Sequence, residues 1–229
     1  MQTQTNTLTT SFAAQLIWIA ETPARGAQHF IKHGYKRAFD LTLSIALLVA
    51  LSPLLLITAL AIVMESRGGI FFRQVRVGLN GETFKMIKFR SMSTDKALHE
   101  KVANMESDRE GVCKKFVNDP RVTRVGNFIR KYSIDELPQL LNVLKGEMSL
   151  IGPRPALTSE VEQYTDYDRK RLEGVPGISG LWQVSGRADL DFEQQVELDI
   201  RYNQKRNLWM DIYIAVMTVP AVLMGKGAY

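Results

Sequence analysis

The sequence predicts a mostly helical α+β protein whose N-terminal part enters a membrane. The prediction depends on a long uncharged apolar run broken by a proline, on an Asn-Gly dipeptide between two segments rich in Val, Phe and Ile, and on several short helical patterns after them. Of the 229 residues, 45% are hydrophobic, which is ample for a core and excludes a disordered chain.

The charge of the chain favours anionic partners. The formal net charge is +5 and the isoelectric point is near 9.3, which suits nucleic acid, an acidic membrane surface or a phosphorylated substrate. Cys113 is the only cysteine, so an intrachain disulfide and a cysteine metal cluster are both excluded. This composition fits a reducing, cytosol-facing location. The short run "FAAQLIWIA" has no basic residues before it, so it is not a convincing secretory signal.

The apolar run extends from Leu41 to Met64, 24 consecutive residues without a charge. As one straight helix it would measure about 36 Å, enough to cross the hydrocarbon core of a bilayer. Pro53 interrupts it, because proline removes a backbone hydrogen bond and clashes with the preceding turn. Each half, about eleven residues long, is too short to cross alone.

Basic residues lie on both sides of this run, and the preference of such flanks for the cytoplasm would place both ends on one face. They are Lys32, Lys36 and Arg37 before the run, and Arg67, Arg73 and Arg76 after it. One interpretation is a re-entrant helical hairpin, in which Ser52 satisfies a carbonyl freed by Pro53. The other is an ordinary tilted span with a proline kink. The residues alone leave both open.

The segment "IFFRQVRVGLNGETFKMIKFRSM" predicts a β-hairpin, because Asn80-Gly81 supplies the positive φ angles of a tight turn. In its second strand, period-two alternation places Lys88 and Arg90 on one face. A solvated basic face is the alternative to a binding role for them.

The segment "YSIDELPQL" places Asp135 and Glu136 just before Pro138, and therefore at the start of a helix. One interpretation is structural: Ser133 and Glu136 match a capping box. The other is a reaction centre, since a helix N-terminus attracts phosphate and an ionised Asp135 could attack phosphorus. Arg130 and a magnesium ion on Glu136 would then offset the repulsion between the anions.

Four later stretches carry weaker signals. "MSLIGPRPAL" holds Arg154 between two prolines, a stiff mount for a guanidinium that binds phosphate. The glycine-rich "GVPGISGLWQVSGR" predicts a loop in close backbone contact and ends at Arg187. "VELDIRY" predicts a helix with Asp199 and Tyr202 on one face, where surface pairing is the alternative to a site. The apolar segment 212–224 predicts an interfacial or buried helix.

Taken together and in order, several stretches resemble the small monotopic phosphoglycosyl transferases of the bacterial sugar transferase family. They are "KRAFDLTLSIALLVALSPLLLI", "KFRSM", "RKYSIDELPQLLNVLKGEMSLIGPRP" and "PGISGLWQVSGR", and the match runs from about Lys36 to Tyr229. The segment Asp-Glu-Leu-Pro-Gln, together with Gly-Pro-Arg-Pro, is highly specific. The closing "GKGAY" is most similar to members that start exopolysaccharide synthesis.

The resemblance implies a re-entrant helix broken at Ser52-Pro53 and a two-step reaction. Asp135 would attack the β-phosphate of a UDP-sugar, expected to be UDP-glucose or UDP-galactose, and release UMP. Undecaprenyl phosphate would then take the phosphosugar from the aspartate, while Glu136 binds Mg²⁺. The other matching polar positions, expected to bind substrate, are Lys88, Arg90, Arg130, Arg154, Arg187 and Asp199.

We therefore expect three regions: an N-terminal extension, partly flexible or interfacial (1–35), a re-entrant membrane hairpin (36–66), and a cytosolic catalytic domain with an interfacial C-terminal helix (67–229). The resemblance implies a minimal enzyme, without the multi-span domain of longer members. It would lie in the bacterial inner membrane, with the catalytic domain on the cytoplasmic face and membrane lipid as a partner. A homodimer is compatible with this, and no nucleic-acid partner is expected. The alternative function is a non-catalytic, membrane-anchored scaffold of polysaccharide assembly.

Overall fold

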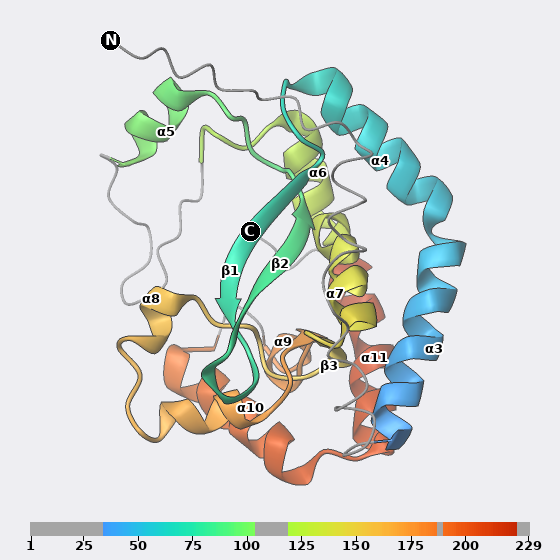
Figure 1. Cartoon of the computed structure of the whole chain (residues 1–229), viewed down its shortest axis with the longest axis vertical. Coiled ribbons are helices and arrows are strands. Elements are labelled where there is room, and N and C mark those ends of the chain that lie inside the picture. The colour runs from blue at the N-terminus through green and yellow to red at the C-terminus, as the bar shows by residue number, and fades with distance from the viewer. Residues whose placement is uncertain (1–33, 104–118, 187–189, 224–229) are drawn as a thin grey trace.

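The computed structural model describes residues 34–103, 119–186 and 190–223 and confirms a mostly helical α+β fold (Figure 1). Nearly all of the predicted N-terminal extension lies outside these ranges. The elements, in chain order, are α3 (Gly34–Ala50), α4 (Ser52–Glu65), β1 (Phe71–Val77), η1 (Leu79–Gly81), β2 (Thr83–Phe89), α5 (Lys96–Ala103), α6 (Arg124–Lys131), η2 (Ile134–Gln139), α7 (Leu140–Lys145), β3 (Ser149–Ile151), α8 (Thr158–Val161), η3 (Asp168–Glu173), β4 (Gly177–Ser179), α9 (Leu181–Val184), α10 (Phe192–Lys205) and α11 (Leu208–Leu223).

Helices α3 and α4 form a bent pair along one edge of the molecule (Figure 1). Among the described residues, no single helix is long and apolar enough to cross a bilayer, but these two pass that test together, with a bend of 62° between them. A re-entrant segment requires this kind of bend, because its two arms must return toward the same face. The structure is therefore consistent with the predicted re-entrant hairpin.

The bend is centred on Ser52 and Pro53. Proline has no N–H to donate to the carbonyl four residues earlier, which is that of Val49. The Ser52 hydroxyl donates to this carbonyl at 2.8 Å, as predicted for the acceptor that Pro53 frees. The helical pattern resumes at once, since the Leu55 amide donates to the Leu51 carbonyl at 2.9 Å.

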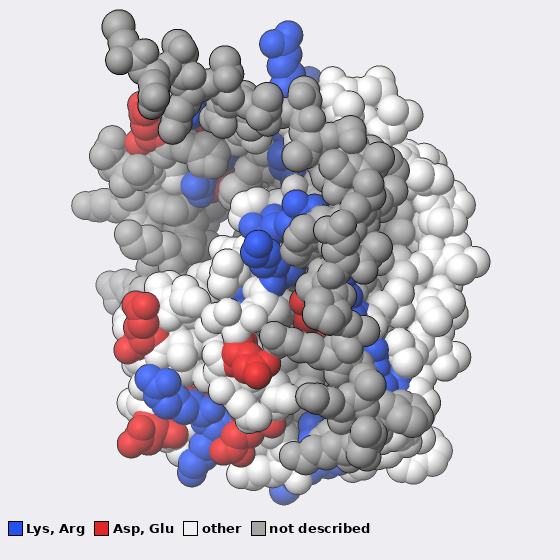
Figure 2. All heavy atoms as spheres, in the orientation of Figure 1, with Lys and Arg blue, Asp and Glu red and all other residues white. Residues whose placement is uncertain are grey.

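The outer face of the bent pair is apolar. In α4, Ile57 is 67% exposed and Met64 is 77% exposed, whereas only Thr58 and Ile62 are buried. Figure 2 shows the consequence as a broad uncharged band along the α3–α4 edge. Exposed apolar surface of this extent is typical of contact with lipid or with another protein.

The polar residues at the start of α3 face inward. Arg37 donates to the carbonyl oxygens of Val143 and Leu144, at 2.5 and 2.8 Å, at the end of α7. Lys36 lies 3.2 Å from Asp211 of α11, and both side chains are almost fully buried. The sequence interpretation treated Lys36 and Arg37 as basic flanks of the membrane run. In the structure they are internal anchors that attach α3 to the rest of the molecule.

The predicted β-hairpin is present at the centre of the molecule (Figure 1). β1 and β2 pair antiparallel, and the turn contains Asn80 and Gly81 with φ angles of 54° and 84°. Asn142 of α7 binds the edge of β2: its side-chain oxygen accepts from the Ile87 amide at 3.0 Å, and its nitrogen donates to the Lys85 carbonyl at 2.9 Å. These contacts fix the hairpin against the helices.

The core lies between the hairpin, α7, β3 and α11, where Met86, Val143, Met148 and Ile214 are almost fully buried. The glycine-rich segment after η3 supplies β4, which pairs parallel with β3. A Cβ on Gly177 would lie only 2.1 Å from the Gly152 nitrogen, so the close backbone contact predicted for this segment is made with the chain itself.

Helix α11 has two distinct faces. Ile214 is fully buried, whereas Trp209, Tyr213 and Val216 are 79%, 55% and 61% exposed. Exposed aromatic and apolar side chains opposite a packed face are typical of helices that lie at a membrane surface. The interfacial location predicted for this segment stays a prediction.

Candidate active site

The acidic pair lies on the 3-10 helix η2, which leads directly into α7. Pro138 is in the early turns of this helical segment, as predicted. The capping-box interpretation is wrong, because Ser133 adopts a left-handed conformation (φ 53°, ψ 21°) and its side chain makes no capping hydrogen bond. The carboxylates of Asp135 and Glu136 are therefore available for other contacts.

Glu136 contacts the hairpin through Lys88. The Lys88 ammonium donates to Glu136 Oε1 at 2.7 Å. The two side chains are 22% and 32% exposed, so a substrate can reach this ion pair from solvent. The pair connects β2 to η2, and the alternation of β2 places Lys88 on the side of the acidic residues.

The two neighbouring carboxyls have different pKa values. Burial raises the pKa of Asp135 to about 6. Of the neighbouring charges, Lys88 lowers this pKa, Glu136 raises it and Arg130 lowers it. Burial also acts to raise the pKa of Glu136, but the charge and hydrogen bond of Lys88, together with the charges of Arg154 and Arg76, lower this pKa overall. Adjacent carboxyls whose pKa values are separated in this way are typical of sites where each has its own role.

Three further cations act on the pair. Arg130, in the last turn of α6, faces Asp135, while Arg154 and Arg76 act on Glu136. Sequence reasoning missed Arg76 as a site residue. A signal was present, because the Asn-Gly turn sets a register in which Arg76 pairs with Phe84, a residue of the core face. A cation on the inward face of a hairpin requires partners inside the protein.

Arg154 is held by its surroundings, as its position between two prolines predicted. Its guanidinium lies 3.4 Å from the carboxylate of Glu160, which is 1% exposed. The other Glu160 oxygen accepts from the Leu157 amide at 2.8 Å, and Arg76 donates to the Pro155 carbonyl at 3.2 Å. The loop that carries Arg154 is thus fixed on both sides.

Arg90, predicted to bind substrate, has backbone carbonyls after α4 as its partners. It is 7% exposed and donates to the carbonyl oxygens of Ser66, Arg67 and Gly69, at 2.7 to 3.0 Å. These acceptors lie at and after the end of α4, where helix carbonyls have no partner within the helix. In this structure Arg90 stabilises the end of the membrane hairpin.

Asp199, also predicted to bind substrate, is completely buried and forms an ion pair with Arg171. Burial raises its pKa to about 6 despite this cation, and the backbone amide of Arg154 stabilises its charged form. Surface pairing of Asp199 with Tyr202 is wrong: Tyr202 is buried and its hydroxyl donates to Asp211 at 2.6 Å. Arg187 lies outside the described residues.

A magnesium ion fits this site as a partner of bound substrate. Among the residues that the structure describes, no three His, Cys, Asp or Glu side chains cluster as a metal site. Glu136 nevertheless offers an ionised, partly exposed carboxylate beside Asp135. Mg²⁺ commonly binds through one or two carboxylates together with substrate phosphate oxygens and water, so this carboxylate fits such an ion, and Mg²⁺ on Glu136 stays a prediction.

The surface agrees with an anionic substrate. Figure 2 shows basic side chains gathered near the centre of the displayed face, over the region of the hairpin in Figure 1. An anionic substrate bound here would meet positive charge.

Comparison with known proteins shows similar sequences among proteins of polysaccharide synthesis. The chain is 42% identical over 198 residues to the exopolysaccharide production protein ExoY of Sinorhizobium fredii, covering 85% of this chain and 88% of that protein. It is 43% identical over 223 residues to the undecaprenyl-phosphate galactose phosphotransferase of Salmonella typhimurium, covering 96% of this chain but 46% of that protein.

A third relative is the UDP-glucose:undecaprenyl-phosphate glucose-1-phosphate transferase of Escherichia coli, 40% identical over 221 residues. This match covers 91% of this chain and 44% of that protein, so the chain spans less than half the length of the two longer relatives. Residues 31–225 match the family described as bacterial sugar transferase, which is most of the chain. The chain therefore belongs to the bacterial sugar transferase family.

Proposed function

We propose that this protein transfers a sugar-1-phosphate from a UDP-sugar to undecaprenyl phosphate and thereby starts exopolysaccharide synthesis. The names of the relatives support the acceptor and the pathway, and they include both a galactose and a glucose enzyme. We therefore propose UDP-galactose or UDP-glucose as the donor. The protein would work at the inner membrane with its site on the cytoplasmic face, where nucleotide sugars are available; a homodimer stays a prediction.

The observation that carries the proposal is the environment of Asp135. Asp135 is 9% exposed, lies next in sequence to Glu136 of the Lys88–Glu136 ion pair, and its carboxyl is influenced by the charge of Arg130. Among the described residues none forms an ion pair with it, in contrast to Glu136. With a pKa of about 6 it is about nine-tenths ionised at pH 7. A partly desolvated carboxylate among cations is suited to attack a diphosphate.

In the first step, an oxygen of Asp135 forms a bond to the β-phosphorus of the UDP-sugar. The bond from that phosphorus to the oxygen bridging the two phosphates breaks, and UMP leaves with this oxygen and its electron pair. Lys88 and Arg130 lower the electrostatic cost of bringing the anions together, and Arg154 binds the phosphate or the nucleotide. No proton transfer is needed, because the attacking group is already ionised.

In the second step, a phosphate oxygen of undecaprenyl phosphate attacks the same phosphorus. The bond between phosphorus and Asp135 breaks, which restores the carboxylate and releases undecaprenyl diphosphate-sugar. Glu136 would hold Mg²⁺, which when bound neutralises charge on the diphosphate. The location of the site beside the apolar hairpin lets a soluble donor and a lipid acceptor reach one carboxylate.

The test is to incubate the purified protein with Mg²⁺ and each UDP-sugar in turn, first without and then with undecaprenyl phosphate. We expect UMP release equivalent to the enzyme present without acceptor, and continuous release with it. Mass spectrometry should find a phosphosugar on the peptide containing Asp135. Asp135→Asn should abolish both UMP release and the adduct. Full support of glycan synthesis by this variant in cells would contradict catalysis and favour a scaffold.

A further inference from the structure

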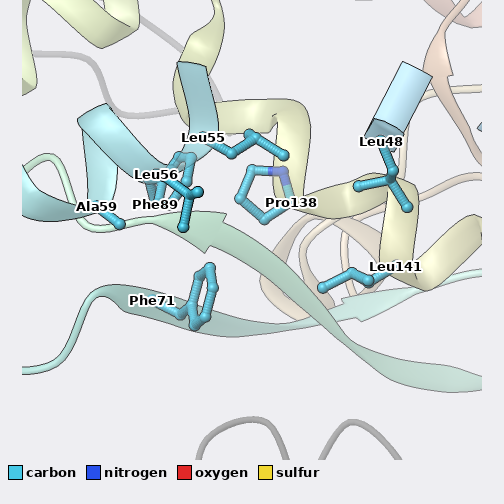
Figure 3. A pocket seen from close by; sticks show the side chains of 8 residues that line it. All are labelled: Leu48, Leu55, Leu56, Ala59, Phe71, Phe89, Pro138 and Leu141. Carbon is cyan, nitrogen blue, oxygen red and sulfur yellow. The ribbon is translucent and has the colours of Figure 1, made fainter. Parts of the chain in front are cut away.

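An apolar pocket lies between the membrane hairpin and the segment that carries Asp135 (Figure 3). Its volume is about 100 Å³. It is lined by Leu48, Leu55, Leu56, Ala59, Phe71, Phe89, Pro138 and Leu141. Every lining residue is apolar, so the pocket excludes the nucleotide, the sugar and free phosphate, which would lose their hydration there.

The bend of the hairpin brings the walls of this pocket together. Leu48 belongs to α3, whereas Leu55 and Ala59 belong to α4, after the break at Pro53. Residues from both arms of the 62° bend therefore line the pocket.

The pocket is continuous with the apolar outer surface. Leu56 lines it and is itself 65% exposed. The neighbouring side chains of Ile57 and Leu60 are 67% and 61% exposed. A hydrocarbon chain on this face can thus enter the pocket without crossing a polar rim.

One residue of the pocket wall belongs to the helix that carries the acidic pair. Pro138 lines the pocket and lies three residues after Asp135 in the 3-10 helix η2. Residues three apart in such a helix eclipse one another, about 6 Å apart along its axis. Glu136, on the same helix, is bonded to the cation Lys88. Positive charge therefore lies near the acidic pair, and the apolar pocket wall begins at Pro138 on the same helix.

We infer that this pocket receives the isoprene unit next to the phosphate of the polyprenyl acceptor, and so positions that phosphate at Asp135. The inference rests on the proposed function. An anionic head on a hydrocarbon chain is the ligand whose charge and apolar parts match this arrangement. Since a cavity of about 150 Å³ holds a benzene molecule, one of about 100 Å³ suits a single isoprene unit.

Filling the pocket tests the inference. In Ala59→Phe the new ring would occupy the space, and Ala61→Phe, on the same helix but outside the lining, is the matched control. With the full chain in nanodiscs, we expect the KM for undecaprenyl phosphate to rise about tenfold or more in Ala59→Phe. The KM should stay unchanged in Ala61→Phe, and UMP release without acceptor should persist in both.

Leu56→Trp provides a second variant that does not depend on repacking, because Leu56 is largely exposed at the mouth of the pocket. It too should raise the acceptor KM. An unchanged KM in both Leu56→Trp and Ala59→Phe would overturn the inference. Loss of membrane retention with an unchanged KM would also overturn it and assign the pocket to a bilayer lipid.

The failure of the proposed function has a different signature. If the unsubstituted protein released no UMP from any UDP-sugar, the proposed function and this inference would fall together. Normal UMP release, combined with an acceptor KM that does not respond to pocket filling, would remove the inference alone.

Discussion

Replacing Asp135 by Asn should abolish activity and, at neutral pH, make the protein more stable. Burial raises the folded-state pKa of Asp135 from 3.8 to about 6, so the fold favours the protonated form. Since one pKa unit corresponds to about 1.4 kcal/mol, keeping this carboxyl ionised costs about 3 kcal/mol at pH 7.5. Asparagine has the same shape without the charge, and its variant should recover up to this amount.

The sign of the effect with pH is fixed by linkage. A raised folded-state pKa gives stability that is fully present below the unfolded value of 3.8 and is lost as pH rises through about 6. At pH 5 the cost is therefore about 1.6 kcal/mol, roughly half of its value at pH 7.5. The advantage of the Asn variant should shrink in the same proportion.

Thermal unfolding of the detergent-solubilised protein at pH 7.5 and pH 5 measures this difference. At about 2–4 °C per kcal/mol, the Asn variant should unfold up to about 6–12 °C higher at pH 7.5. Glu136→Gln is the matched control: Lys88 holds the pKa of Glu136 low, so loss of that charge should not stabilise the fold. An Asn variant that is less stable than the unsubstituted protein at pH 7.5, or a gain independent of pH, would refute the reasoning.

Two further predictions concern the pH dependence of the first step and the cap at the end of α4. The kcat/KM for the donor, measured by UMP release in a stopped-time assay, should follow the ionised fraction of Asp135. It should reach half of its maximum near pH 6 and about a tenth at pH 5. A half-maximal value near pH 4 would contradict the buried environment of Asp135. Arg90→Met should lower the free energy of unfolding by about 2–4 kcal/mol, because several carbonyls after α4 lose a buried donor. Urea unfolding with Arg67→Met as an exposed control measures this, and equal losses in the two variants would argue against the cap.

Local signals in the sequence predicted much of the fold. Pro53 predicts the break because proline cannot donate, and Ser52 predicts its repair, since its hydroxyl reaches the carbonyl concerned. Asn80 and Gly81 predict the hairpin because they tolerate positive φ. Each of these features depends on residues close together in the chain. The location of Asp135 at the start of a helical segment was predicted in the same way, from Pro138.

Roles that depend on distant partners were not predictable. Arg90 was placed with the site by resemblance, but its acceptors follow α4, more than twenty residues earlier in the chain. Asp199 matches a position expected to bind substrate, yet Arg171 neutralises it inside the protein. Arg76 was treated as a membrane flank although the hairpin register places it opposite the core residue Phe84; its acceptor, the Pro155 carbonyl, lies 79 residues later in the chain. Charge in a sequence does not show whether a side chain faces solvent, lipid or another part of the chain.

The buried base of α3 also has a consequence for how the protein is made. Arg37 depends on carbonyls 106 and 107 residues later, and Asp40 accepts from the amide of Leu150. The ribosome therefore completes α3 and α4 long before it synthesises the groups that bind the first turns of α3. The first turn of α3 can therefore be fastened to the catalytic unit only after α7 and β3 have been translated.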